Sequence, residues 1–178
     1  MAEGKRRLIL FDSNLFIWGF KPVSPETPKR EAEQIRKVRG LLAQCAKEKS
    51  IIHLSVISVS EVLQGIPEEA HVEVLKVMSE NFIVLPLDQP AAAISAVLAR
   101  RLRKMDIQAG DDKNKLRNDL YILAIGEQNH CTDFYTDDGT LRNQAERLGV
   151  SMQVHPLPDA PPEQLDLPYD DIANSRQG

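Results

Sequence analysis

Acidic side chains stand beside apolar segments at widely separated places in this chain. They are Asp12 after the run 8–11, Glu61 within 59–63, Asp119 within 116–120, and Asp137 and Asp138 after 134–136. A carboxylate taken out of water needs a compensating partner, and few lysines or arginines lie in the same local patterns. We therefore expect these carboxylates to meet in one pocket around a divalent cation, a site suited to phosphodiester chemistry.

The elements that must position these acids alternate along the chain. Strands are predicted at 7–11, 51–56, 82–85, 133–136 and 150–154, and helices at 28–49, 91–105, around 116–124 and at 140–148. A short helix carrying Glu61 should be capped by Ser58 or Ser60, and a further helix follows near 72–78. Prolines 22, 25 and 28 indicate a loop after the first strand, and a polar loop is expected at 105–113.

Strands that alternate with helices predict right-handed crossovers and a parallel sheet covered on both faces. The expected fold class is α/β: one three-layer α/β/α domain with a central, mainly parallel sheet of four or five strands. This domain should span residues 1–154. Residues 155–178 are rich in proline and acids and have little periodicity, which predicts an extended or disordered tail.

Composition limits the class of protein. The 178 residues are 42% hydrophobic and 27% charged, as in ordinary globular proteins, and the net charge of −4 argues against a broad basic coat for nucleic acid. No apolar run approaches the roughly 18–20 residues needed to span a bilayer, and the apolar stretch after the basic N-terminus ends at Asp12, short of the roughly 7 residues of a signal-peptide core. We expect a cytoplasmic protein that does not bind membranes.

The predicted fold can bring the acids together. In an open parallel sheet the binding crevice lies beyond the carboxyl ends of the strands, where Asp12 and the pair Asp137 and Asp138 are expected. Glu61 can point back to the same edge, and Asp119 lies on the helix stripe that faces the sheet. Each acid also has a simpler interpretation: a turn or helix cap at 12 and 137–138, a first-turn acid at 61, an early-helix acid at 119.

Four segments together resemble the PIN-domain nucleases. The segments are 10–16, with an apolar strand leading into Asp-x-Asn; 58–65, with Glu followed by Gly; 118–124, with Asn-Asp-x-x-Ile-x-Ala; and 135–141, with Thr-x-Asp before an apolar residue. They occur in the family's order between about Leu8 and Val154. The most similar subgroup is the VapC-like toxin ribonucleases, from which this chain differs in its longer 106–113 loop and its Pro-rich tail.

The resemblance implies a metal-dependent endoribonuclease that uses Mg²⁺ or Mn²⁺. Asp12, Glu61, Asp119 and Asp138 match the acidic quartet of the family, with catalytic and metal-binding roles. Asp137 is an additional candidate metal ligand, and it remains open whether Asp137 or Asp138 is the primary one. The resemblance further implies site-supporting roles for Asn14 and Thr136, an RNA substrate, a homodimer, and an antitoxin or other inhibitory protein as partner.

Basic residues gather around the loop that precedes Asp119. We interpret them either as an RNA-binding rim or as a solvated helix face. They are Arg100, Arg101, Arg103, Lys104, Lys113, Lys115 and Arg117.

Two other functions compete with the nuclease hypothesis. A phosphatase of the haloacid-dehalogenase type also begins with an apolar strand and an Asp, but it requires an acid where Asn14 stands. A non-catalytic RNA-binding PIN-like module would keep the fold without the chemistry. A dinucleotide-binding role has little support, because no G-x-G-x-x-G follows the first strand.

Overall fold

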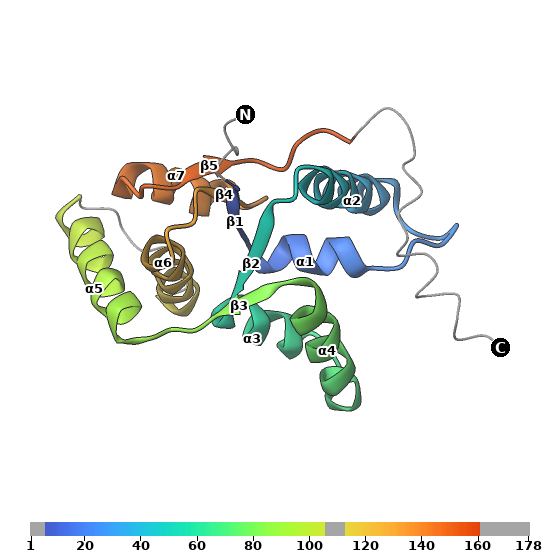
Figure 1. The fold of residues 1–178 in the computed structure, drawn as a ribbon, viewed down its shortest axis with the longest axis horizontal. Coiled ribbons are helices and arrows are strands. Elements are labelled where there is room, and N and C mark those ends of the chain that lie inside the picture. The colour runs from blue at the N-terminus through green and yellow to red at the C-terminus, as the bar shows by residue number, and fades with distance from the viewer. Residues whose placement is uncertain (1–5, 106–112, 161–178) are drawn as a thin grey trace.

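The computed structural model describes residues 6–105 and 113–160, so residues 161–178 of the predicted 155–178 tail and most of the predicted 105–113 loop lie outside the described residues (Figure 1). Its strands are β1 (Leu8–Phe11), β2 (Ile51–Ser55), β3 (Ile83–Leu85), β4 (Asp133–Tyr135) and β5 (Gln153–His155). Its helices are α1 (Ser13–Phe20), α2 (Lys29–Lys47), α3 (Val56–Gln64), α4 (His71–Asn81), α5 (Gln89–Lys104), α6 (Lys113–Gln128) and α7 (Gly139–Leu148), with a 3₁₀ turn at Glu68–Ala70.

The strands form one sheet in the order β3-β2-β1-β4-β5, and every neighbouring pair is parallel. The predicted fold class is therefore confirmed, with five strands. The chain runs outward from β1 through β2 to β3, and then returns across the sheet to β4 and β5. The strand order thus reverses between β1 and β4, which is where an open α/β sheet forms its crevice.

Helices cover both faces of this sheet (Figure 1). On one face, α5, α6 and α7 pack around Leu10 and Phe134, which are fully buried. On the other face, α1 to α4 contribute to a cluster around Ile9, Phe11 and Tyr135. Successive strand residues point to opposite faces, so the continuous apolar runs of β1 and β4 feed both layers.

Two local differences from the sequence prediction bear on the site. Among the predicted helices none directly follows Asp12, where only a turn or helix cap was considered; α1 begins there, and Gly19 lets it lie close to Val38 and Leu42 of α2. Glycine and a nearby proline weaken helix propensity, but packing against α2 overrides this preference. Helix α3 begins earlier than predicted, because Ser55 and not Ser58 or Ser60 caps it, with the Ser55 hydroxyl accepting from the Ser58 amide at 2.9 Å.

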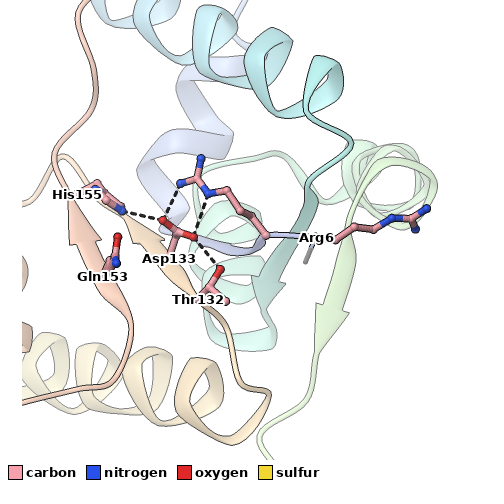
Figure 2. A pocket seen from close by; sticks show the side chains of 6 residues that line it. Arg6, Thr132, Asp133, Gln153 and His155 are labelled. Atoms are coloured by element: carbon pink, nitrogen blue, oxygen red, sulfur yellow. Dashed lines mark hydrogen bonds and ion pairs between the residues drawn. The ribbon is translucent and has the colours of Figure 1, made fainter. Parts of the chain in front are cut away.

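A network of charged residues joins the amino ends of β1 and β4 to β5 (Figure 2). Asp133 is buried, and its carboxylate accepts hydrogen bonds from Arg7 Nη2 at 2.6 Å and from Thr132 Oγ1 at 2.7 Å. It also pairs with His155 Nε2 at 2.8 Å. Burial raises the pKa of Asp133, but these hydrogen bonds outweigh it and lower the pKa to about 2. The adjacent cavity measures about 360 Å³. This edge is opposite to the one where the acids were expected.

The chain remains packed beyond the boundary predicted at residue 154. His155 belongs to β5, and Leu157 is 9% exposed within the core cluster that includes α2. Asp159 pairs with Lys37 of α2 at 3.5 Å. None of the helices within 6–105 and 113–160 is long and apolar enough to cross a membrane.

Candidate active site

The ends of β1 and β4 place the first pair of acids. Asp12 is 4% exposed, and its amide donates to the Tyr135 carbonyl at 3.1 Å, which continues the pairing of the two strands. Asp12 Oδ1 accepts from the Ser13 amide at 2.8 Å and caps α1. Asp12 Oδ2 accepts from the hydroxyl of Thr136 at 2.8 Å. The helix-cap interpretation of Asp12 is therefore correct, and it leaves the second oxygen oriented by Thr136.

Thr136 connects Asp12 to Asp138. It is fully buried, and its hydroxyl also accepts from the Asp138 amide at 3.0 Å. Asp138 Oδ1 accepts from the amides of Thr140 and Leu141 at 2.8 and 3.1 Å and caps α7. Both strand-end acids thus use one oxygen for a helix cap, and the other oxygen pairs with a different side chain: Thr136 for Asp12 and Lys115 for Asp138.

Helices α3 and α6 contribute the other two acids. Glu61 and Asp119 both lie well past the first turns of their helices, so the first-turn and early-helix interpretations are wrong. Asn118 Nδ2 donates to Glu61 Oε1 at 3.0 Å and joins the two helices. Asp119 is 7% exposed, and its carboxylate accepts no hydrogen bond from any residue in the described ranges.

The four carboxylates influence one another electrostatically. Burial raises the pKa of Asp12, the hydrogen bonds from Thr136 and Ser13 oppose this, and the charges of Glu61 and Asp138 raise it further. Burial also raises the pKa of Asp119, to about 7; Lys115 opposes the shift, and the charges of Asp12, Asp138 and Glu61 add to it. These charge effects place the four acids in one neighbourhood, although no three of them within the described residues are grouped closely enough to hold an ion.

Lys115 supplies one of the acids with the positively charged partner that few local sequence patterns offered. Its ammonium group contacts Asp138 Oδ2 at 2.6 Å. Partial burial raises the pKa of Asp138, but the Lys115 bond and the two amides outweigh it and lower the pKa. The hydrogen bond to Asp138, with the charges of Asp138, Asp119 and Asp12, in turn raises the pKa of Lys115. Lys115 was expected only as part of an RNA-binding rim.

The remaining predicted site residues have no hydrogen bond or salt bridge to the four acids within the described residues. Asp137 is exposed, and Asn14 is exposed in α1 without a side-chain hydrogen bond to a described residue. Arg101 donates to the Leu148 carbonyl at 3.2 Å, at the far end of α7, and Arg117 donates to Asn114 at 3.0 Å. The other predicted rim residues, apart from Lys115, are exposed: Arg100, Arg103, Lys104 and Lys113.

Two side chains at the site were not predicted. Asn118 orients Glu61, and Arg142 Nη1 donates to the Thr136 carbonyl at 3.5 Å. Asn118 is adjacent to Asp119 in a motif segment, which was a usable signal. Arg142 follows Asp138 by one helical turn, a spacing that places two side chains on one helix face.

The donor types at this site fit a hard divalent cation. Carboxylate oxygens are the ligands that Mg²⁺ and Mn²⁺ prefer, and two of the four carboxylates, those of Asp12 and Asp119, belong to buried residues. Within residues 6–105 and 113–160, the side chains of this conformation do not form a ready cation site. No three of them, counting Asp, Glu, His and Cys, are grouped so that they could hold an ion. Side chains must therefore move before a cation can bind.

Solved structures with the same fold identify the architecture. This chain is similar to VapBC2 from Rickettsia felis, whose structure was solved bound to a DNA fragment from the VapBC2 promoter. The match covers 84% of this chain and 98% of that chain, with a TM-score of 0.58 and 14% identity. It is similar over 82% of this chain to FitAcB from Neisseria gonorrhoeae, covering 95% of that chain, with a TM-score of 0.54 and 20% identity. This chain has the PIN-domain fold of VapC-like proteins.

A third PIN-domain similarity is to VapBC-1 from nontypeable Haemophilus influenzae, with a TM-score of 0.57, 16% identity, and coverage of 84% of this chain and 98% of that chain. No protein-family model and no curated protein matches the sequence. Identities this low establish the fold and leave the chemistry to be argued from the PIN-domain site itself.

Proposed function

We propose that this PIN-domain protein is a metal-dependent endoribonuclease that hydrolyses RNA phosphodiester bonds. The observation that supports this most is that Asp12 and Asp138, linked through Thr136, follow β1 and β4 where the strand order reverses, with Glu61 and Asp119 close enough to act on the same site electrostatically. Asp12 and Asp138 are the proposed direct ligands, with Asp137 as an outer acid. When bound, Mg²⁺ or Mn²⁺ polarises a phosphoryl oxygen and lowers the pKa of a bound water.

The side chains of this chain have distinct proposed roles. Thr136 holds Asp12 Oδ2 in position, and Asn118 holds Glu61 Oε1. Asp119 has a pKa of about 7, so its carboxylate is suited to accept a proton from an attacking water near neutral pH. Glu61 is proposed to bind the cation or to orient that water. Asn14 retains only a proposed supporting role.

RNA is the proposed substrate because cationic side chains lie near the acids. Lys115 contacts Asp138, and Arg142 contacts the Thr136 carbonyl. The exposed Arg103, Lys104 and Lys113 are proposed to bind phosphates more weakly, so RNA binding should weaken as salt concentration rises.

Cleavage of a mixed RNA pool with Mn²⁺, Mg²⁺ or EDTA tests this proposal. Asp12→Asn and Asp138→Asn should abolish cleavage and still fold, because asparagine also caps helices. Asp88→Asn is the matched control, since Asp88 caps α5 beside the edge strand β3 by accepting from the Ala91 amide at 2.9 Å. Cleavage that is indifferent to EDTA and to both variants would contradict the proposal.

Partner proteins are proposed on two grounds. Two of the similar structures are VapBC complexes and one is FitAcB. On this chain, apolar side chains are exposed on α4 and β3, as expected for a surface that another protein covers: Val72, Leu75, Ile83 and Val84. We propose a homodimer in the cytoplasm and an inhibitory partner of the antitoxin type. Sedimentation of the purified protein tests the dimer, and a monomer at micromolar concentration would contradict it.

A non-catalytic RNA-binding module is the second candidate. It is favoured by one observation, that the acidic side chains of the described residues are not grouped as a ready cation site. RNA binding that is the same with Mn²⁺ and with EDTA, without cleavage under any metal, would support it. Turnover of p-nitrophenyl phosphate that Asp12→Asn abolishes would instead support the phosphatase.

A further inference from the structure

Within residues 6–105 and 113–160, Lys115 is the only lysine or arginine that forms a salt bridge with one of the four acids of the site, and its partner is Asp138. Its ammonium group contacts Asp138 Oδ2, whereas Asp138 Oδ1 is occupied by the capping of α7. Asp12 is held by Thr136 and Ser13, and Glu61 by Asn118. The Asp138 oxygen that does not cap α7 is therefore already paired with a positive charge from the same chain.

The local helix does not favour a lysine at this position. Lys115 lies in the first turn of α6, and the amino end of a helix carries a partial positive charge that repels cations. The attraction that holds the ammonium group comes from the acids, since the charges of Asp138, Asp119 and Asp12 all favour charged Lys115. If a divalent ion neutralised those acids, both attraction and pairing would be lost.

The side chain has room to leave. The Lys115 side chain is 56% exposed, compared with 17% for that of Asp138, and a lysine carries its ammonium group on a flexible four-carbon stem. The α7 cap uses the other oxygen of Asp138, so exchange at Oδ2 does not require α7 to unfold.

We propose that Lys115 is a tethered counter-cation that occupies Asp138 until a divalent ion displaces it, and that it thereby sets the metal affinity of the site. The inference rests on the proposed metal-dependent function. A single Asp138 oxygen cannot hold the ammonium group and the ion together at contact distance. The measured affinity is therefore the intrinsic affinity reduced by the fraction of molecules in which Lys115 has moved away.

Mn²⁺ binding to the full-length protein, measured from the free Mn²⁺ signal in electron paramagnetic resonance, tests this. Lys115→Met should tighten Mn²⁺ binding by about tenfold or more, because it removes a unit charge at contact distance from a ligand. Lys115→Arg keeps the charge and should stay within about twofold of the wild type.

Lys113→Met is the matched control. Lys113 lies in the same helical turn, is exposed, and makes no ion pair with a described residue, so its replacement changes net charge equally and should shift the affinity by less than about twofold. An equal effect of Lys115→Met and Lys113→Met would overturn the proposal. A Lys115 ammonium signal in nitrogen-15 spectra that is unchanged at saturating Mg²⁺ would also overturn it.

The outcomes separate this proposal from the proposed function. If Asp12→Asn abolishes Mn²⁺ binding but Lys115→Met leaves the affinity unchanged, the counter-cation role is wrong and the metal site stands. If no variant binds Mn²⁺, both proposals fail. If Lys115→Met tightens Mn²⁺ binding and no RNA is cleaved, the counter-cation role stands and the ribonuclease proposal fails.

Discussion

Asp119 is a buried carboxylate with a pKa of about 7, compared with an ordinary value of 3.8. Its position in α6 fixes it beside three other acids without a hydrogen bond from a described residue. Between these two pH values the unfolded chain loses a proton that the folded chain retains. The stability that Asp119 contributes is therefore fully present below about pH 3.8 and is lost as the pH rises to about 7.

Replacing Asp119 with asparagine should remove this pH dependence. In EDTA, Asp119→Asn should gain stability over the wild type as the pH rises from about 5 to about 8, because no charge needs to be buried. Urea unfolding at several pH values measures the difference. The exposed Asp137 provides the control, and Asp137→Asn should retain the wild-type slope. Equal slopes for the wild type and Asp119→Asn would contradict the role assigned to Asp119.

At the scale of elements, the two edges of the sheet carry different charge arrangements. At the carboxyl edge, acids gather with Lys115; at the amino edge, Asp133 is fully paired with Arg7, Thr132 and His155 (Figure 2). The pKa of Asp133 is lowered to about 2, so its contribution to stability is present above pH 3.8 and lost as the pH falls toward about 2. The amino edge therefore stabilises the strands, and the carboxyl edge is where we propose that the chemistry takes place.

We predict that Asp133→Asn lowers the free energy of unfolding by about 2 kcal/mol, because charged hydrogen bonds joining β1, β4 and β5 are lost. Metal-dependent RNA cleavage by the folded variant should be unchanged. Denaturant unfolding and an RNA assay measure the two effects. Arg6→Met is the control, since Arg6 is exposed and has no ion pair with a described residue. A loss of cleavage without a loss of stability would contradict this division.

The packing of α6 against β1 sets the position of Asp119. Gly126 lies where an added Cβ would approach Met152 Sδ at 2.6 Å and Leu10 Cδ2 at 2.8 Å. Gly126→Ala should therefore destabilise the protein by about 1–2 kcal/mol, because overpacking exceeds the gain of up to about 1 kcal/mol in helix propensity. Thermal unfolding measures this. Gly65→Ala is the control, because its added Cβ meets only the Val62 carbonyl oxygen, at 3.6 Å. A stabilised Gly126→Ala variant would show that α6 can shift freely.

At the scale of the whole molecule, the core extends past the predicted domain boundary at residue 154. Leu157 belongs to the core cluster that includes residues of α1 and α2. Two residues later, Asp159 forms a salt bridge with Lys37 of α2. We predict that Leu157→Ala costs about 2 kcal/mol or more, as for other buried leucines. Urea unfolding measures this, with Pro156→Ala at an exposed neighbouring position as the control. Equal stability of both variants would place the boundary at 154, as the composition suggested.

The sequence by itself determined the alternation of strands and helices, the acids at the ends of β1 and β4 and the helix cap at Asp12. These features are local, because apolar periodicity and capping side chains depend on a few neighbouring residues. The motif segments carried the PIN-domain hypothesis for the same reason.

Only the tertiary structure decided which groups face the acids. Lys115 and Asp138 are 23 residues apart and Asn118 and Glu61 are 57 residues apart, yet each pair is in contact. Arg101, from the same basic cluster as Lys115, contacts Leu148 at the far end of α7 instead. Helix α1 likewise forms against α2 despite weak local signals. Such contacts depend on strand order and helix packing, which no short stretch of sequence encodes.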